Sequence, residues 1–327
     1  MYFTKADQEL TIDFFHHGML TLTGPEDRIL ILLPWQTQGS VGDLLQIALR
    51  RMKAMPLPYG PVSDPRAAVR YALHSGATAI VGIPVQVLAM ARHKEGHLLR
   101  NKIKYVLLCT DYVPQAICRA LEAAWGCSVF QHYGMTEMGL GGGVQCRALR
   151  GYHLREADLF FEIVDPESGE VLPEGETGEV VFTTLTREGM PLIRYRTGDV
   201  SSFLPGKCPC GTVLRSLALI KNRVDGFIQF GGGKITLPDL DEKLFDFDFI
   251  LDYKAYVRKN GEQSELQLVL KTVDGSKADL SAVIKSVLIL PALQDSERHR
   301  LILQVTEEPD FTAFTGGTAK RTITVIQ

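Results

Sequence analysis

From residue 28 to residue 131, short apolar runs alternate with amphipathic segments, and this alternation limits the folds open to the chain. Residues 28–34 form a nearly continuous series of Ile and Leu, which is typical of a parallel strand buried on both faces. Further strands are expected at 77–81, 104–109 and 128–131, and helices at 41–54, 65–74, 84–91 and 113–125. This order of elements predicts an α/β domain built on a parallel sheet. An additional helix should begin at Thr4, because Asp7 follows it at the spacing of a helix cap.

The pattern changes in the second half of the chain. Strand-like runs at 159–164, 179–184 and 200–204 are separated by Gly and Pro turns, which indicates a β subdomain. Beyond Asp225 we expect a compact α+β unit with a Gly-rich hairpin, a helix from about Pro238, strands at 253–258 and 266–270, and a helix at 280–288. The predicted division is a large domain over 1–224, of which 1–150 is α/β and 151–224 is the β subdomain, followed by a small domain over 225–327.

Composition excludes several classes of partner. A net charge of -3 argues against nucleic acid, because binding to its backbone needs a marked basic excess. No apolar run reaches the roughly 20 residues of a membrane span, and the first residues do not form a signal peptide. We therefore expect a cytoplasmic protein without a membrane partner, in which the six cysteines serve as thiols or metal ligands rather than disulfides.

Two short stretches carry the chemistry. The first, residues 133–137, joins the aromatic ring of Tyr133, the turn residue Gly134, the hydroxyl of Thr136 and the carboxylate of Glu137. These groups suit stacking on a purine, a close backbone approach, a phosphate contact and a hard-metal ligand. The second, residues 195–199, ends in a turn that presents Asp199, whose carboxylate can accept both hydroxyls of a ribose. Together they predict a pocket for an adenylate.

These stretches, with Arg223-Val224-Asp225-Gly226 and Gly231-Gly232-Gly233 behind them, resemble the AMP-forming acyl-CoA ligase superfamily. The segment at 165–179 resembles the phenylacetate–CoA ligase branch in particular. The resemblance implies a parallel-sheet large domain, a β subdomain and a C-terminal lid. It implies ATP, Mg²⁺ and CoA as cofactors and substrates and a small carboxylic acid as the group activated. The sequence leaves both a monomer and a homodimer open.

The resemblance also assigns roles to residues. Tyr133 would stack on adenine, with His132, Thr110 and Asp111 along its edge and Gly134 giving the close approach. The catalytic residues would be Thr136 on the phosphate, Glu137 on Mg²⁺, and Lys320. Asp199 and Arg223 would bind the ribose. Asp225 would be the hinge of the lid, and Gly231 would let the pantetheine arm of CoA pass close to the backbone.

The sequence departs from the family pattern at two places. It contains no Ser/Thr/Gly-rich loop for the ATP phosphates, so the chain is either a fragment or a shortened homologue. Thr318 stands where the family has a lysine that reaches the α-phosphate, and Lys320 lies two positions further on. Two functions follow as alternatives: an acid–CoA ligase, with an aryl acid favoured by the resemblance, and a non-catalytic nucleotide-binding homologue with a regulatory or scaffolding role.

Four residues form a candidate metal site. Cys208 and Cys210 flank a proline and precede a Gly turn, which offers two thiolates to one ion, while Cys146 and His153 are separated by six residues. The resemblance to the phenylacetate–CoA ligase branch implies a structural Zn²⁺ held by these four ligands, a set that closes a tetrahedron. The alternative is that they are ordinary cysteines and a turn histidine. Cys109, Cys118 and Cys127 are expected to be buried apolar residues.

Overall fold

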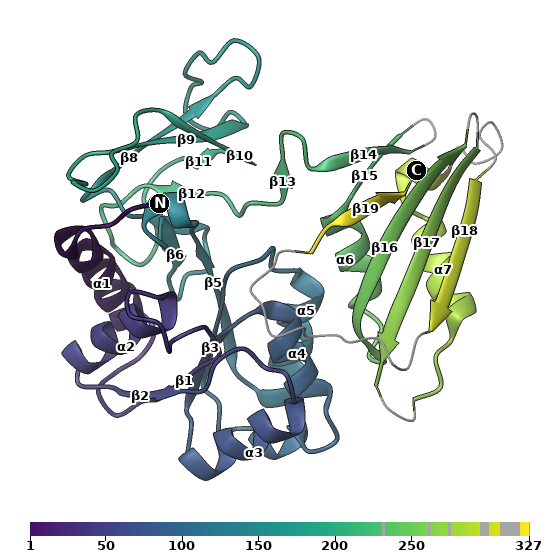
Figure 1. The fold of residues 1–327 in the computed structure, drawn as a ribbon, viewed down its shortest axis with the longest axis horizontal. Helices are drawn as coiled ribbons and strands as arrows, with labels where there is room; N and C mark the ends of the chain where they lie inside the picture. Colours follow the sequence, from purple (N-terminus) through teal and green to yellow (C-terminus); the bar gives the residue numbers. More distant parts are fainter. Residues whose placement is uncertain (231–232, 261–262, 274–275, 295–300, 308–320, 327) are drawn as a thin grey trace.

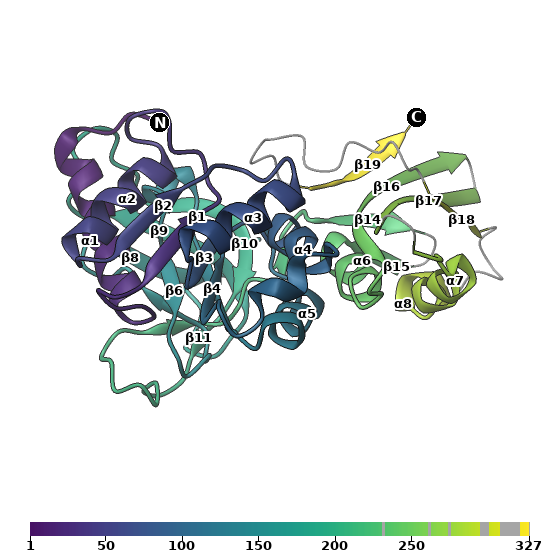
Figure 2. The same cartoon turned by 90° about the horizontal axis from the view of Figure 1, so that it is seen from below.

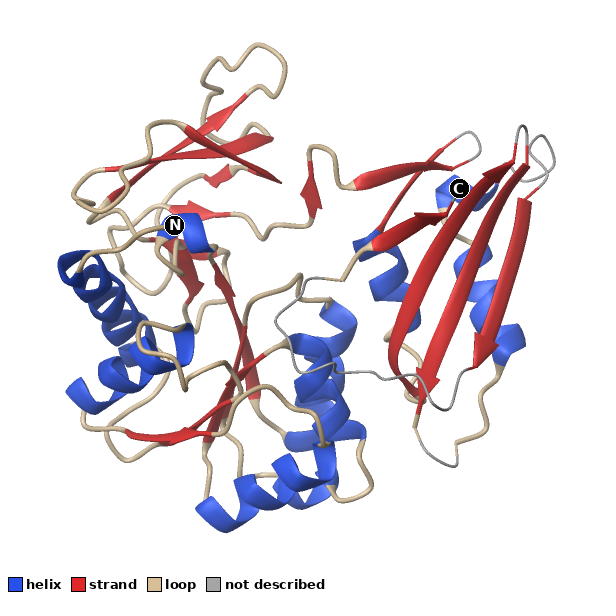
Figure 3. Cartoon of the chain, viewed as in Figure 1, coloured by secondary structure: helices blue, strands red, loops and turns tan. Residues whose placement is uncertain are grey.

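The computed structural model describes residues 1–230, 233–260, 263–273, 276–294, 301–307 and 321–326 (Figure 1). A large α/β part is followed by a small β-sheet and then by a C-terminal unit (Figure 3). Lys320 and Gly231, which were predicted to contact ligands, and Thr318 lie outside the described residues. Within the described part of the chain, no helix is both long and apolar enough to cross a membrane.

The centre of the large part is a nine-stranded mixed sheet. Its order is β11-β12-β7-β6-β5-β4-β3-β1-β2, parallel from β2 to β5 and antiparallel from β5 to β11. The strands are β1 (Arg28–Ile31), β2 (Met55–Pro58), β3 (Ala79–Gly82), β4 (Tyr105–Leu108), β5 (Ser128–Tyr133), β6 (Gly143–Gln145), β7 (Tyr152–Leu154), β11 (Phe203–Leu204) and β12 (Ser216–Leu217). Every residue of β3 is buried, as expected for a strand covered on both faces.

Helices surround this sheet. They are α1 (Lys5–Leu20), α2 (Val41–Arg51), α3 (Pro65–Ser75), α4 (Pro84–Arg92) and α5 (Gln115–Trp125), with 3₁₀ turns η1 (Gly96–Leu99) and η2 (Thr136–Met138). The predicted alternation of strands and helices is confirmed. The sequence did not reveal β2, whose Pro56 and Pro58 are poor strand residues tolerated because β2 is at the edge of the sheet. It also missed β6 and β7, which are only three residues long each.

A second, four-stranded antiparallel sheet packs beside the first and has the order β13-β10-β9-β8. Its strands are β8 (Leu159–Val164), β9 (Gly178–Thr184), β10 (Tyr195–Ser201) and β13 (Asn222–Arg223). The single strand predicted at 200–204 is divided in the structure: Val200 and Ser201 end β10, whereas β11 joins the large sheet. Region 151–224 therefore contributes strands to both sheets.

The C-terminal unit is a hairpin and a four-stranded sheet with helices on one face (Figure 2). The hairpin is β14 (Phe227–Phe230) and β15 (Gly233–Thr236); the sheet, of order β18-β17-β16-β19, is β16 (Ile250–Asn260), β17 (Gln263–Thr272), β18 (Leu301–Glu307) and β19 (Ile323–Ile326); the helices are α6 (Leu237–Leu244), α7 (Leu280–Leu288) and α8 (Pro291–Gln294).

Charged contacts join the C-terminal unit to the large part. Glu242 on α6 accepts hydrogen bonds from the Tyr112 hydroxyl at 2.9 Å and from the backbone N–H groups of Gln115 and Ala116 at 2.7 and 3.1 Å. The carboxylate thus caps the first turn of α5, where helix N–H groups lack partners. Arg119 on α5 pairs with Asp246 at 2.6 Å. Helices α5 and α6 consequently lie side by side (Figure 2).

Arg321 makes the second connection. Its guanidinium is buried and donates to both carboxylate oxygens of Asp241 at 2.7 and 2.8 Å, and its Nε donates to Asp111 of the large part at 3.3 Å. The ring faces of Phe245 and Tyr253 lie 5.2 and 5.7 Å from its Cζ atom. Because a buried cation needs this many partners, Arg321 and its carboxylates fix the start of β19 against the large part.

The N-terminus of α1 offers a test of local stability. Thr4 Oγ1 accepts from the Asp7 N–H at 3.1 Å and Asp7 accepts from the Thr4 N–H at 2.8 Å, which confirms the predicted cap. Thr4→Ala should lower the free energy of unfolding by about 1 kcal/mol, whereas Thr4→Ser, which keeps the hydroxyl, should lower it much less. Urea unfolding followed by tryptophan fluorescence reports this directly, because both tryptophans, Trp35 and Trp125, lie in the large part. Equal stability of the Ala variant and the parent would contradict the cap.

Candidate functional site

A cavity of about 350 Å³ lies where the carboxyl ends of β4 and β5 meet the β10 turn and the C-terminal unit. Ligand pockets of α/β proteins are expected at this edge of the sheet. Sequence-predicted residues that line it are Thr110, Asp111, His132, Tyr133, Gly134, Asp199 and Arg223. The structure therefore brings together side chains that are up to 113 positions apart in the sequence (223 − 110).

Tyr133, Asp199 and Arg223 form a connected group on one wall. The Tyr133 hydroxyl donates to Asp199 Oδ2 at 3.0 Å, and Arg223 Nη1 donates to Asp199 Oδ1 at 2.8 Å. Burial, reinforced by the Asp199 carboxylate, raises the pKa of Tyr133 well above its usual value, so its hydroxyl stays a donor. The Tyr133 ring stacks on Tyr152 with centroids 5.7 Å apart. The Asp199 carboxylate, held by these two donors, also lines the cavity.

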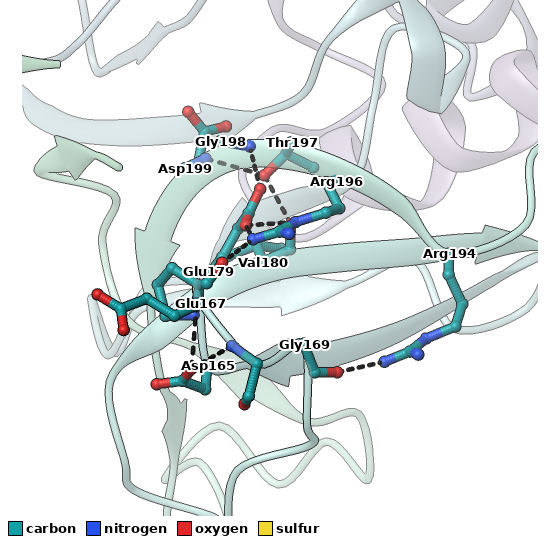
Figure 4. A network of polar contacts seen from close by, with 12 residues as sticks. Asp165, Glu167, Gly169, Glu179, Val180, Arg194, Arg196, Thr197, Gly198 and Asp199 are labelled. Carbon is teal, nitrogen blue, oxygen red and sulfur yellow. Dashed lines mark hydrogen bonds and ion pairs between the residues drawn. The ribbon is translucent and has the colours of Figure 1, made fainter. Parts of the chain in front are cut away.

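A bulge in β10 aims Asp199 at this wall. The pairing of β10 with β9 is interrupted between Arg196 and Val200. In Figure 4, Glu179 of β9 accepts from Arg196 Nε at 2.7 Å and from the Gly198 N–H at 2.9 Å. Thr197 Oγ1 donates to the Val180 carbonyl at 2.7 Å and accepts from the Asp199 N–H at 3.0 Å. The contacts of Glu179 and Thr197 thereby fix the backbone of the bulge that carries Asp199.

Gly134 in the cavity wall and Gly198 next to Asp199 cannot be replaced without disturbance. Gly198 has a φ of +75°, and a Cβ there would meet Arg223 Nη2 at 2.6 Å. A Cβ on Gly134 would meet the Leu140 carbonyl oxygen at 2.6 Å. Gly198 therefore permits the close approach of Arg223 to Asp199, and Gly134 permits the close packing of the loop after β5.

Thr110 and Asp111 follow β4 directly. Thr110 has a φ of +79°, a rare backbone conformation for a β-branched residue and one that concentrates at functional sites. The Asp111 carboxylate accepts from the Tyr112 N–H at 2.9 Å and from Arg321. Asp111 thus lines the cavity and at the same time anchors the C-terminal unit.

His132 lines the cavity and also packs against α1. Its ring packs against Phe14 and Phe15 of α1, with centroids 6.0 and 6.1 Å away, while another part of it reaches the cavity. Burial, with a smaller contribution from Arg155, lowers the pKa of His132 to about 4. The imidazole is therefore neutral near pH 7.

Thr136 and Glu137 lie on η2, beyond the described lining of the cavity. Thr136 is exposed and Glu137 is half-buried. The Glu137 carboxylate is close enough to Tyr195 to raise the pKa of that phenol, as Asp199 also does, although burial is the largest cause. Tyr195 is therefore within electrostatic reach of both Glu137 and Asp199.

Several lining residues were not predicted, among them Tyr112, Lys221, Phe227, Arg321 and Thr322. Lys221 and Phe227 flank the predicted 223–226 stretch, and Arg321 directly follows Lys320, so proximity in sequence was the available signal. Tyr112 directly follows the predicted Asp111, but its contact with Glu242 cannot be read from the sequence.

The four predicted metal ligands also come together. The ligand atoms of Cys146, His153, Cys208 and Cys210 all lie within 4.8 Å of one another. Cys146 Sγ is 3.7 Å from Cys208 Sγ, and Cys210 Sγ is 3.4 Å from His153 Nε2. His153 Nδ1 is 3.2 Å from the Ser216 hydroxyl. Cys109, Cys118 and Cys127 are buried, as expected.

Known sequences resemble this chain over about half of its length. The profile of the AMP-binding enzyme family matches residues 9–185. The phenylacetate–coenzyme A ligase of Thermus thermophilus is 32% identical over 170 residues, which are 51% of this chain and 38% of that protein. The phenylacetate–coenzyme A ligase of Aromatoleum evansii is 41% identical over 130 residues, which are 39% of this chain and 29% of that protein. The chain thus spans about a third of the length of these curated relatives.

Solved structures share the fold. A 2-hydroxyisobutyryl-CoA ligase in the postadenylation state, in complex with 2-HIB-AMP, matches with a TM-score of 0.80 at 20% identity, over 99% of this chain and 70% of that one. The same ligase in the thioesterification state, in complex with 2-HIB-AMP and CoA, gives 0.63 at 20% identity, over 99% and 70% of the two chains. An anthranilate CoA ligase with anthranoyl-AMP gives 0.66 at 14% identity, over 94% and 61%.

The profile covers more than half of the chain, and the relatives at 32% and 41% identity are ligases of its phenylacetate–CoA branch. The chain therefore belongs to the AMP-binding enzyme family.

Proposed function

We propose that this protein is an AMP-forming carboxylate–CoA ligase, and that the cavity beside Asp199 binds the adenylate. The observation that carries the proposal is the Tyr133–Asp199–Arg223 group, because a carboxylate held by a cation and a phenol is a rigid acceptor for ribose hydroxyls. The cavity volume of about 350 Å³ lies within the usual range for small-molecule pockets.

The proposed reaction has two steps. The substrate carboxylate attacks the α-phosphorus of ATP, pyrophosphate leaves, and the thiol of CoA then displaces AMP from the acyl-adenylate. Negative charge increases on the α-phosphate, so cationic groups at the wall stabilise the transition state. Arg223 and Lys221, which both line the cavity, are suitably placed on this chain. Mg²⁺ would neutralise phosphate charge and would be held by Glu137, while Thr136 would contact the phosphate.

The C-terminal unit would act as the lid of the adenylation step. Its contacts through Glu242 and Arg321 close one side of the cavity. The structural likeness is greater to the postadenylation state of the 2-hydroxyisobutyryl-CoA ligase than to its thioesterification state, which supports this assignment. Asp225, whose side chain is 86% exposed, and Gly226 would supply the hinge. Gly231 and Lys320 remain predicted contacts of CoA and the α-phosphate.

The cysteine cluster would hold a structural Zn²⁺. Tetrahedral zinc with Zn–S bonds of about 2.3 Å places two sulfurs about 3.8 Å apart, close to the 3.7 Å between Cys146 and Cys208. Ser216 would orient the His153 ring through Nδ1, as second partners of zinc ligands commonly do. The ion would tie the segments after β6 and β11 to β7, within the sheet that carries Tyr133.

Asp199 provides the test of nucleotide binding. Asp199→Ala should weaken AMP binding by about 1.5–3 kcal/mol, the range for hydrogen bonds to a charged group. Calorimetry on parent and variant measures this, with Asp13→Ala as a matched control, because Asp13 is exposed on α1 and pairs only with the exposed His17 in the described structure. Equal AMP affinity in Asp199→Ala and parent would remove Asp199 from the site.

Zinc content can be measured independently. Protein purified without chelators should contain close to one zinc per chain, and Cys208→Ser with Cys210→Ser should lose it. The double variant should also melt at a lower temperature, because a structural metal contributes folding free energy. Cys118→Ser with Cys127→Ser is the matched control, since it alters two buried thiols outside the cluster and should keep the metal. Finding no metal in the parent would contradict the zinc site.

The ligase reaction is best tested by its second step. Supplied with phenylacetyl-AMP and CoA, the protein should form phenylacetyl-CoA faster than buffer does, and Asp199→Ala should reduce the rate by about 10-fold or more, in line with the expected loss of binding. Synthesis from ATP is a weaker test, because the 327-residue chain has no phosphate loop and carries Thr318 in place of lysine. AMP binding without any thioester formation would reduce the proposal to the non-catalytic alternative.

A further inference from the structure

Helix α5 takes its N-terminal cap from the C-terminal unit. In the described structure its own N-cap residue, Pro114, makes no side-chain hydrogen bond to the helix, and its first turn has no acidic residue. Instead Glu242 of α6 accepts from the N–H groups of Gln115 and Ala116. A carboxylate is favourable at this end of a helix, because the first N–H groups lack partners and the helix dipole is positive there.

Helix α6 receives the opposite contact from the large part. Arg92, in the last turn of α4, donates through Nη2 to the Phe245 carbonyl at 2.7 Å and through Nη1 to the Ile250 carbonyl. Phe245 is the C-cap residue of α6, and Ile250 begins β16. Burial lowers the pKa of Arg92 to about 10, so its guanidinium is still a cation at pH 7. A cation is favourable at the carbonyl end of a helix.

The two helix-end contacts are reciprocal. Each part of the molecule supplies a charged group to the free backbone groups at a helix end of the other part, and α4, α5 and α6 lie close together (Figure 2). These contacts add to the apolar packing between the parts. Breaking either contact removes the partner of a charged side chain and of backbone groups at a helix end.

The position of α6 determines part of the wall of the nucleotide cavity. Leu237 and Pro238, the first two residues of α6, line the cavity together with Arg321 of the same unit. Glu242 and Arg92 are not among the residues that line it in the described part of the chain. Because α6 is a short, continuous helix, contacts at its middle and at its C-terminal end also fix its first turn at the cavity.

We propose, resting on the ligase function above, that Glu242 and Arg92 are positioning residues for adenylate binding, which together hold α6 where it closes the nucleotide cavity. The two helix-end contacts then form and break together, since both join the large part to the same C-terminal unit. A nucleotide that contacts both sides of the cavity favours the state in which both contacts are formed.

Hydrogen exchange tests whether the two contacts are coupled. The measured signals are the Gln115 and Ala116 amides, which donate to Glu242. Arg92→Gln leaves these atoms unchanged, yet it should speed their exchange about tenfold or more, the effect of losing hydrogen bonds to a charged group. Arg92→Lys keeps a cation and should restore part of the protection. The matched control is Arg119→Gln, which removes an exposed ion pair across the same interface and should have a much smaller effect.

Addition of AMP tests the link to the nucleotide cavity. A ligand that binds only the closed state slows exchange by a factor of one plus the ratio of its free concentration to its Kd. AMP at about ten times its Kd should therefore slow exchange of the two α5 amides about tenfold in the parent. The amides of β3, a fully buried strand within the large sheet, are the reference when the variants are compared without AMP, and their exchange should stay at the parent rate.

Faster exchange in Arg92→Gln that is confined to residues 245–250 would show two separate contacts and overturn the proposal. Faster exchange of the β3 amides as well would show that Arg92 supports the whole fold, and this too would overturn it. AMP that binds without slowing the α5 amides would remove the link between these contacts and the nucleotide. Failure of the parent to bind AMP is a different result, because it removes the ligase function on which the proposal rests.

Discussion

The ion pair between Asp199 and Arg223, joined by the Tyr133 hydroxyl, is the interaction on which the site depends. Its members come from three strands in two sheets: β5 in the large sheet, and β10 and β13 in the small one. Arg223 is half-exposed and Asp199 is buried, so the pair alone stabilises the fold little, but it fixes where the two sheets meet. The Asp199 carboxylate has a defined orientation at the cavity wall because of three features: the bulge in β10, the glycine at 198 and the contacts of Glu179.

A second group of contacts holds the C-terminal unit, which forms part of the cavity wall. Buried apolar residues of the large part and of the C-terminal unit belong to one core cluster, and charged contacts add to this packing: Glu242 caps α5, and Arg321 connects Asp241 to Asp111. Such contacts have a specific geometry. Breaking them costs less free energy than opening a packed core, because water and other ions can replace each partner. A lid that changes position between two reaction steps needs contacts that can be broken in this way.

The sequence predicted the parts of this protein whose physics is local. Apolar runs such as 28–34 and the Thr4 cap depend on neighbouring residues, and the structure confirms them. Of the motif at 133–137, Tyr133 and Gly134 line the cavity with Asp199, whereas Thr136 and Glu137 lie beyond its described lining. What could not be predicted depends on contacts distant in sequence: the Glu242 cap of α5, Tyr112 and Arg321 in the cavity wall, and the packing of His132 on Phe14. Strand β2 was missed for a different reason. Its prolines disfavour a strand in general, but a strand at the edge of the sheet can accept them.

The central claim is that an adenylate binds with its ribose on Asp199. A crystal structure of the protein with AMP measures this most directly. The account predicts the two ribose hydroxyls within hydrogen-bond distance, about 2.6–3.2 Å, of the Asp199 carboxylate, with Arg223 still paired to it. AMP bound elsewhere on the molecule, or bound in this cavity with the ribose turned away from Asp199, would contradict the account.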